Sequence, residues 1–117
     1  SHAVSIERIN LADGVPIMYE INLFPYQKFA FLLEEPLDGS LFELLEKKCH
    51  TIVSYSNNSY LDLARASGRI AKELRVPNRE PLFFLYSEGY DSNNELVYIG
   101  KDYVLADQYR FYLDDPK

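Results

Sequence analysis

Alternating polar and apolar residues near the start of the chain predict a β-hairpin. The two alternating segments are Ala3–Leu11 and Val15–Phe24, and this period is typical of strands with one buried face. Between them, Asp13-Gly14 favours a two-residue turn, because both turn positions need positive φ. Such a turn fixes the register of the hairpin. It places Val4 opposite Leu23, Ile6 opposite Ile21, Arg8 opposite Tyr19 and Asn10 opposite Ile17.

These side chains share one face of the hairpin, and that face is the more apolar of the two. We therefore expect it to be the core side, with Arg8 pointing inward. A buried guanidinium is costly unless an anionic group pairs with it. Its partner could be a bound ligand or a protein carboxylate such as Asp102 or Asp107, and a position at the sheet rim that reaches water is a further alternative. Asn10 is compatible with an ordinary satisfied polar residue.

The middle of the chain predicts two short helices. The first covers residues 40–49, and Ser40 and Glu43 have the spacing of a capping box, a pattern that marks a helix N-terminus. The second covers residues 68–75, with Ser67 as its N-cap. The segment Pro25–Leu33 is short and ambiguous, and it is compatible with a helical turn.

The remaining segments predict more strands. Thr51–Leu63 reads as a long extended stretch, Pro81–Tyr90 and Glu95–Leu105 as strands joined by a turn at Asp91–Asn94, and Tyr109–Leu113 as a short final strand. Hairpins mixed with separate helices indicate an α+β fold, with a mainly antiparallel β-sheet and flanking helices.

Composition narrows the class of protein. The chain has 117 residues, of which 47% are hydrophobic, and this suits one globular domain. Its formal charge of −6 repels phosphate backbones, so we do not expect it to bind DNA unaided. A single cysteine, Cys49, allows no intrachain disulfide, and the composition suits the reducing cytoplasm. No apolar run reaches the ~18–20 residues of a membrane span.

The sequence offers little that is typical of an enzyme. It contains no Gly-rich phosphate loop followed by lysine, no nucleophile elbow and no convincing carboxylate pair for acid–base work. Cys49 and His50 are neighbours at a predicted helix end, where adjacent side chains do not face each other. We therefore expect no catalytic residues, no metal site and no cofactor.

Four segments carry a family resemblance. They are Ile6–Pro16, Asp38–Glu46, Ala71–Leu82 and Ala106–Phe111. In this order they resemble the motifs of the UTRA domain, the C-terminal effector-binding and dimerisation half of GntR-type bacterial transcription regulators of the HutC subfamily. The resemblance implies a chorismate lyase-like fold over residues 3–115. It also implies a homodimer, which contacts DNA only through an N-terminal winged-helix domain that this chain does not include.

The resemblance also implies a site for a small-molecule effector such as a sugar phosphate, a sugar or a small organic acid. In sugar-phosphate-responsive members, arginines of the first hairpin and the start of a helix hold the anionic group. Asn10 and Phe42 stand where many relatives have arginine and tyrosine, which weakens the case for a phosphorylated ligand. The family positions fall on Arg8, Asn10, Ser40, Phe42, Asp102 and Tyr109.

Elementary chemistry supports part of this site. The first turn of a helix favours anions, Gly39 lets the backbone approach a ligand, and Arg8 can contact carboxylate or phosphate with two hydrogen bonds. Tyr98 is expected on the same face of its predicted strand as Asp102, and it is a further candidate for contact with the ligand. Each residue also has a structural reading: Ser40 as a cap alone, for example, or Asp102 as a partner of Arg8.

Two other functions are compatible with the sequence. A dimerisation module with a degenerate pocket would fit the departures at Asn10 and Phe42. An enzyme similar to chorismate lyase would also use arginine and a carboxylate around an anionic substrate, although the motif matches are to the regulator domain.

Overall fold

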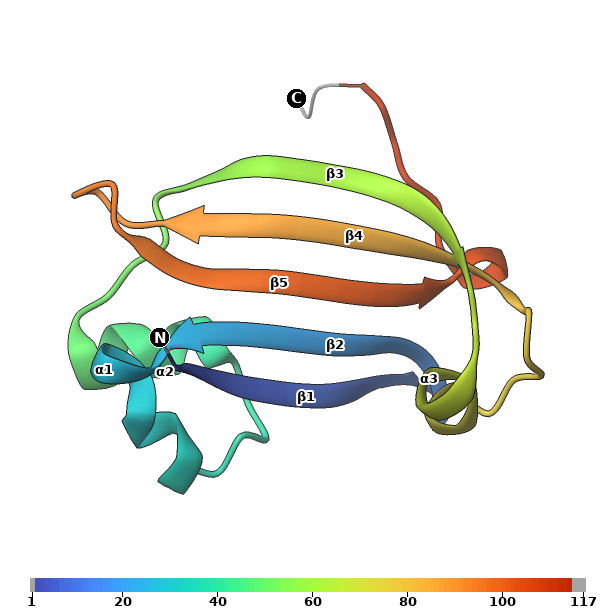
Figure 1. Cartoon of the computed structure of the whole chain (residues 1–117), viewed down its shortest axis with the longest axis horizontal. Coiled ribbons are helices and arrows are strands. Elements are labelled where there is room, and N and C mark those ends of the chain that lie inside the picture. Colours follow the sequence, from blue (N-terminus) through green and yellow to red (C-terminus); the bar gives the residue numbers. More distant parts are fainter. Residues whose placement is uncertain (1, 115–117) are drawn as a thin grey trace.

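A computed structural model describes residues 2–114 of the chain. Its centre is a five-stranded antiparallel sheet in the order β1-β2-β5-β4-β3 (Figure 1). The predicted α+β fold with a mainly antiparallel sheet is confirmed; of the expected domain 3–115, residue 115 lies outside the described residues. The strands are β1 (Ala3–Ala12), β2 (Val15–Pro25), β3 (Tyr55–Arg65), β4 (Pro81–Tyr90) and β5 (Leu96–Leu105).

Helical segments pack at opposite ends of the sheet (Figure 1). Near one end lie α1 (Tyr26–Phe29), the 3₁₀ segment η1 (Ala30–Glu34) and α2 (Leu41–Cys49); near the other lies α3 (Gly68–Leu74). The ambiguous segment after β2 is thus helical. None of the helices in residues 2–114 is both long and apolar enough to span a membrane.

The first hairpin has the predicted turn but a different register. Asp13 and Gly14 both have positive φ, 50° and 80°. Ala12 pairs with Val15 and Leu11 with Pro16, but a bulge then shifts the ladder so that Arg8 pairs with Glu20. The predicted pairing of Arg8 with Tyr19 is therefore wrong, as are the other pairs predicted beyond the bulge. The cause is one extra residue on β2, Ile17, which moves every later side chain of that strand to the opposite face.

Each face of the sheet carries a core, and different helices cover the two cores. On the face of Val4, Ile6 and Phe24, the core includes side chains from α1, η1 and α2. On the opposite face, Tyr19 packs in a second core with Leu74 and its neighbours in α3. The expectation of a single core side is therefore wrong, although the face that carries Val4, Ile6 and Arg8 is indeed buried at its α2 end.

The end of α2 explains why β3 begins later than predicted. His50 adopts the left-handed conformation (φ 53°), its N–H donates to the Glu46 carbonyl, and the Thr51 N–H donates to the Leu45 carbonyl. The bond from His50 is that of the αL motif, in which a left-handed residue closes a helix. The Thr51 N–H is thus bonded to the helix and its side chain is buried. The strand therefore starts only later, at Tyr55.

The predicted final strand Tyr109–Leu113 does not form. A 3₁₀ turn, η2 (Ala106–Gln108), follows β5, and the chain after it is irregular. Both edges of β4 are already paired, with β5 and β3, so this segment contacts β4 through side chains. The ring of Phe111 meets that of Phe83 edge-on at 5.2 Å between centroids.

Candidate functional site

A cleft of about 940 Å³ crosses the sheet beside the N-terminus of α2. Its floor comes from β2, β5 and β4, one wall from the start of α2, and the other from β3 and the C-terminal segment. The volume lies within the range of small-molecule sites. The lining residues are Arg8, Glu20, Asn22, Ser40, Leu41, Phe42, Ser59, Tyr60, Leu61, Leu85, Tyr86, Ser87, Tyr98, Gly100, Asp102, Phe111, Tyr112 and Leu113.

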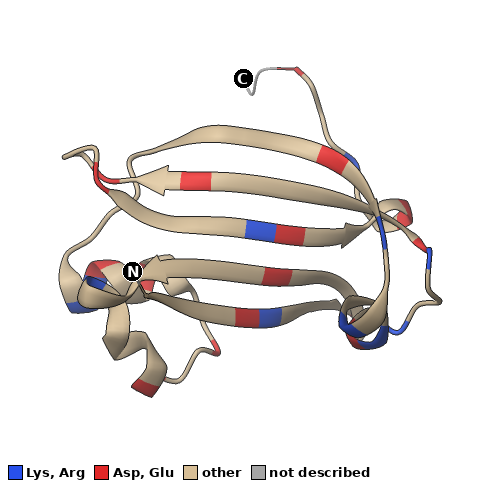
Figure 2. Ribbon diagram, viewed as in Figure 1, with Lys and Arg blue, Asp and Glu red and all other residues tan. Residues whose placement is uncertain are grey.

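Charged positions fall near the middle of β1, β2 and β5, which lie side by side in the sheet (Figure 2). Arg8 pairs with Glu20, and Glu20 pairs with Asp102 on the next strand. The antiparallel ladder therefore places one cation and two carboxylates in a row on one face.

The Arg8 guanidinium contacts groups of the protein with all three nitrogens. Nη2 and Nε lie 2.8 and 3.2 Å from Oε1 of Glu20, and Nη1 donates to the carbonyl oxygens of Gly39 and Leu37 at 2.7 and 3.5 Å. Arg8 is thus turned toward the interior, as the sequence predicts. Its protein partner is Glu20, and not Asp102 or Asp107, because the bulge at Ile17 brings Glu20 onto the face of Arg8.

Glu20 is also fully engaged. Its Oε1 accepts a hydrogen bond from the amide of Asn22 at 2.9 Å, and its Oε2 accepts one from the amide of Asn10 at 3.1 Å. Charge-assisted bonds of this kind are short and directional. Four side chains of the first hairpin therefore form one connected polar network beneath the cleft.

Asp102 has no such support. Its Oδ1 is buried, and it has no hydrogen-bond partner among the described residues. Burial, with a further contribution from the nearby charge of Glu20, raises the pKa of Asp102 from 3.8 to about 6. Both effects disfavour the charged form. Asp102 is thus an acceptor that the protein itself leaves unused.

Tyr98 forms the aromatic part of the floor. Its ring meets Phe42 of α2 edge-on at 5.1 Å between centroids and lies 6.2 Å from the ring of Phe24. It covers Gly89, where an added Cβ would overlap the ring, and Gly100, where an added Cβ would lie 3.0 Å from it. Burial raises the pKa of the Tyr98 hydroxyl above its ordinary value.

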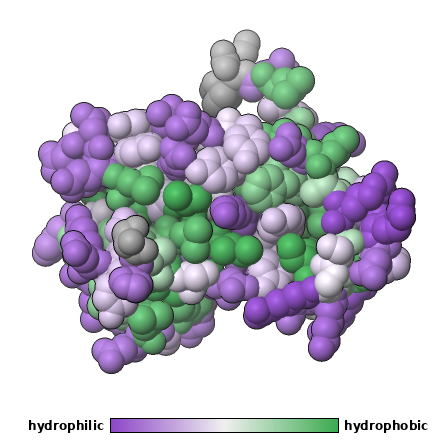
Figure 3. Space-filling model, viewed as in Figure 1, coloured by the Kyte–Doolittle hydropathy of each residue, from purple (hydrophilic) through white to green (hydrophobic). Residues whose placement is uncertain are grey.

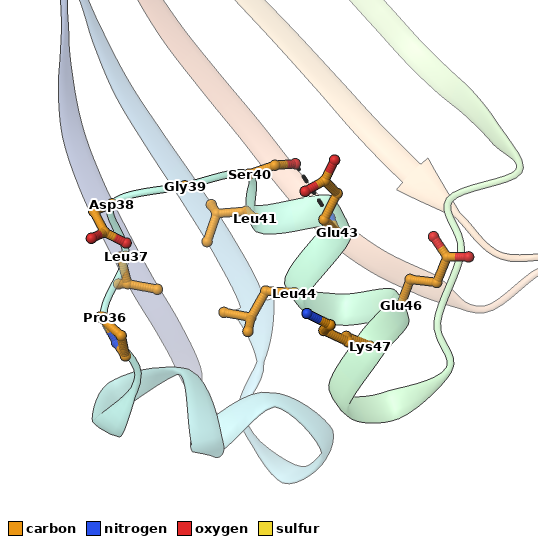
Figure 4. Close-up of a pocket in the computed structure, with 10 residues that line it drawn as sticks. All are labelled: Pro36, Leu37, Asp38, Gly39, Ser40, Leu41, Glu43, Leu44, Glu46 and Lys47. Atoms are coloured by element: carbon orange, nitrogen blue, oxygen red, sulfur yellow. Dashed lines mark hydrogen bonds between the residues drawn. The ribbon is translucent and has the colours of Figure 1, made fainter.

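A second, smaller hollow of about 530 Å³ lies between the loop before α2 and the helix itself. In Figure 4, Leu37, Leu41 and Leu44 point into the space between the loop and the helix, and Ser40 reaches Glu43. The Glu43 N–H donates to the Ser40 hydroxyl at 3.3 Å, which confirms Ser40 as the N-cap. Its lining includes three carboxylates and one lysine, Asp38, Glu43, Glu46 and Lys47, but no aromatic ring.

Comparison with known proteins identifies the chain. The family model for the UTRA domain matches residues 1–110. The chain belongs to the UTRA domain family. The resemblance seen in the sequence is therefore confirmed.

Solved structures agree with this assignment at the level of the fold. The C-terminal domain of YurK from Bacillus subtilis superposes with a TM-score of 0.89 at 19% identity, covering 97% of this UTRA domain and 78% of that chain. A GntR-family transcriptional regulator from Enterococcus faecalis superposes with a TM-score of 0.84 at 23% identity, covering 97% of this domain and 81% of that chain. The effector domain of PhnF from Mycobacterium smegmatis superposes with a TM-score of 0.86 at 22% identity, covering 94% of this domain and 67% of that chain. The Enterococcus faecalis protein is described as a transcriptional regulator and the PhnF domain as an effector domain.

The UTRA domain brings five of the eight predicted site residues to the cleft. Arg8, Ser40, Phe42, Tyr98 and Asp102 line it.

The other three predicted residues lie near the cleft. The Asn10 amide donates a hydrogen bond to Glu20, although Asn10 itself does not line the cleft. Gly39 contributes its carbonyl oxygen to Arg8 and lines the smaller hollow. Tyr109 packs against Phe111, with 4.8 Å between ring centroids, and does not line the cleft, where Phe111 and Tyr112 stand instead.

Sequence reasoning missed Glu20 and Asn22, because the predicted register placed them on the other face. One signal was available. Pro16 cannot donate to a ladder, and proline in a strand is confined to edges, strand starts and bulges. Pro16 lies directly before Ile17 near the start of β2, and it is therefore a sign of irregular pairing there.

Proposed function

We propose that this UTRA domain is the effector-sensing part of a GntR-type transcription regulator of the HutC subfamily, with a small metabolite binding in the cleft across the sheet. Family membership and the regulator relatives support this function. The observation that carries it is the cleft itself, which joins strands of the sheet to the first turn of α2. We further infer a cytoplasmic homodimer whose DNA contacts are made by an N-terminal winged-helix domain.

The geometry offers a way for a ligand to act on the rest of the molecule. Arg8 already connects β1 to the loop before α2 through the carbonyl oxygens of Leu37 and Gly39. A ligand that contacts both the floor and Phe42 would favour one distance between sheet and helix over others. A ligand shifts a conformational equilibrium only by such differential affinity.

A thermal-shift screen of sugars, sugar phosphates, amino acids, amines and short organic acids tests this proposal. A compound present at about 100 times its dissociation constant adds about 2.7 kcal/mol to the free energy of unfolding. Phe42→Ala should weaken binding of that compound by roughly three- to tenfold, because an aromatic contact contributes about 0.5–1.5 kcal/mol.

The matched control is Leu33→Ala, which removes an exposed apolar side chain outside the cleft and should leave the dissociation constant unchanged. A screen in which no compound stabilises the domain would contradict the sensing function. It would favour the dimerisation module instead.

A further inference from the structure

Among the described residues, Arg8 is the only cation that lines the cleft, and Glu20 already neutralises it. Arg8, Glu20 and Asp102 are the charged residues of the lining, and the side chains of Arg8 and Glu20 retain only 25% and 15% exposure in their ion pair. A phosphate that approached Arg8 would have to displace Glu20, and it would lie beside two carboxylates. Like charges at close range in a partly buried site repel strongly.

What the cleft offers instead is an unused acceptor with a negative charge. Oδ1 of Asp102 is buried and has no protein partner among the described residues. With Arg8 and Glu20 cancelling each other, Asp102 gives the lining a net charge of −1 when it is ionised. A cationic nitrogen would satisfy both the orphaned oxygen and the charge, whereas a neutral hydroxyl would satisfy only the first.

Aromatic rings supply the rest of a cation site. The faces of such rings attract ammonium groups, most strongly where water is partly excluded. Six aromatic side chains line the cleft: Phe42, Tyr60, Tyr86, Tyr98, Phe111 and Tyr112.

We propose that the effector of this domain is a small amine that presents a positively charged nitrogen to Asp102, and that it carries no phosphate at Arg8. This rests on the proposed sensing function and names the chemical class of its ligand. Glu20 acts as the selectivity residue, because it occupies the guanidinium that would otherwise hold an anion.

Matched sets of probes test the ligand class by isothermal titration at pH 7.5. One set is glucosamine, glucose and glucose 6-phosphate; another is ethanolamine, ethylene glycol and 2-hydroxyethyl phosphate. The amine of at least one set should bind at least about tenfold more tightly than its neutral member, and the phosphorylated member should not bind. Asp102→Asn should abolish the preference for the amine.

A second experiment needs no effector. Inorganic phosphate at millimolar concentration should leave the amide spectrum of the wild-type domain unchanged. In Glu20→Gln, which frees Arg8 at nearly constant shape, phosphate should shift the amide signals of Gly39 and Ser40. Glu34→Gln removes the same charge from an exposed position outside the cleft and should behave as wild type.

The outcomes separate the two proposals. Binding of glucose 6-phosphate or inorganic phosphate to the wild-type cleft, lost in Arg8→Ala, would overturn the amine class and leave the sensing function intact. Failure of phosphate to bind folded Glu20→Gln would contradict the selectivity role of Glu20. If no metabolite of any class binds the wild-type domain, the sensing function itself fails.

Discussion

Single side chains in the cleft differ in what they contribute to the stability of the folded state, and Asp102 is the clearest case. Burial and the nearby charge of Glu20 raise its pKa to about 6, and its Oδ1 has no hydrogen-bond partner among the described residues. Arg8 and Glu20, by contrast, satisfy each other and are held by Asn10 and Asn22. The difference predicts opposite responses to pH and to substitution.

Asp102→Asn should stabilise the domain at pH 7.5 by roughly 1–2 kcal/mol, after allowance for the partial solvent exposure of this carboxyl. The pKa of Asp102 is raised in the folded state from 3.8 to about 6, so the folded protein holds the proton more tightly than the unfolded chain. Stability contributed by this group therefore increases as the pH falls from about 6 to about 4, and the ionised form is the costly one.

Urea denaturation of both proteins at pH 7.5 and pH 4 measures the difference. The variant should have the advantage at pH 7.5 and lose most of it at pH 4. Asp62→Asn, at an exposed position of β3, serves as the control. An equal gain at both pH values would show that the Asp102 charge does not strain the fold.

At the level of secondary structure elements, the two main helices are capped in different ways. The Ser40 hydroxyl accepts a hydrogen bond from Glu43 N–H at the start of α2. Ser67 also occupies the N-cap position, of α3, but its side chain makes no capping bond. The sequence predicts both serines as N-caps, with a capping box only at Ser40, and only Ser40 makes the side-chain bond.

Ser40→Ala should therefore lower the free energy of unfolding by about 0.5–1 kcal/mol, near the lower limit for a lost cap because the bond is exposed. Ser67→Ala removes the same hydroxyl and should change stability by less than about 0.3 kcal/mol. Chemical denaturation of both variants beside wild type checks the pair. If Ser67→Ala proved the more destabilising, the assigned capping bonds would be wrong.

Across the whole molecule, the sheet leaves two edges, and they differ. Val4 and Ile6 of β1 are buried, whereas nearly every residue of β3 is exposed. Several of those exposed residues are large and apolar, among them Tyr60, Leu61 and Leu63. Apolar surface also remains visible over the middle of the molecule, between polar groups at its ends (Figure 3). An exposed apolar edge strand favours pairing with another chain.

Leu63→Lys should weaken the proposed homodimer without unfolding the domain. Leu63 is 79% exposed, so its loss costs the monomer little, while a charge on each copy of the edge opposes pairing. Sedimentation velocity over a range of concentrations should show a higher dimer dissociation constant for this variant. Leu33→Lys, exposed on η1, is the control; equal effects of the two substitutions would exclude β3 as the interface.

Local chemistry was enough to predict many of the elements. Asp13-Gly14 encodes its turn through the positive φ that both positions adopt, and Ser40 with Glu43 encodes the start of α2. Four short motifs in order led to the family and the fold, which the family model confirms. These features depend on residues that are close together in the sequence, so they can be predicted from the sequence alone.

The partners across the sheet needed the folded structure. One extra residue at Ile17 puts Glu20 on the face of Arg8, and the pairing of β2 with β5 then puts Glu20 beside Asp102. The segment after η2 stays out of the sheet because β4 has no free edge. Strand alternation has a period of two, so a one-residue slip reverses every later side chain, and long-range pairing alone selects between the two arrangements.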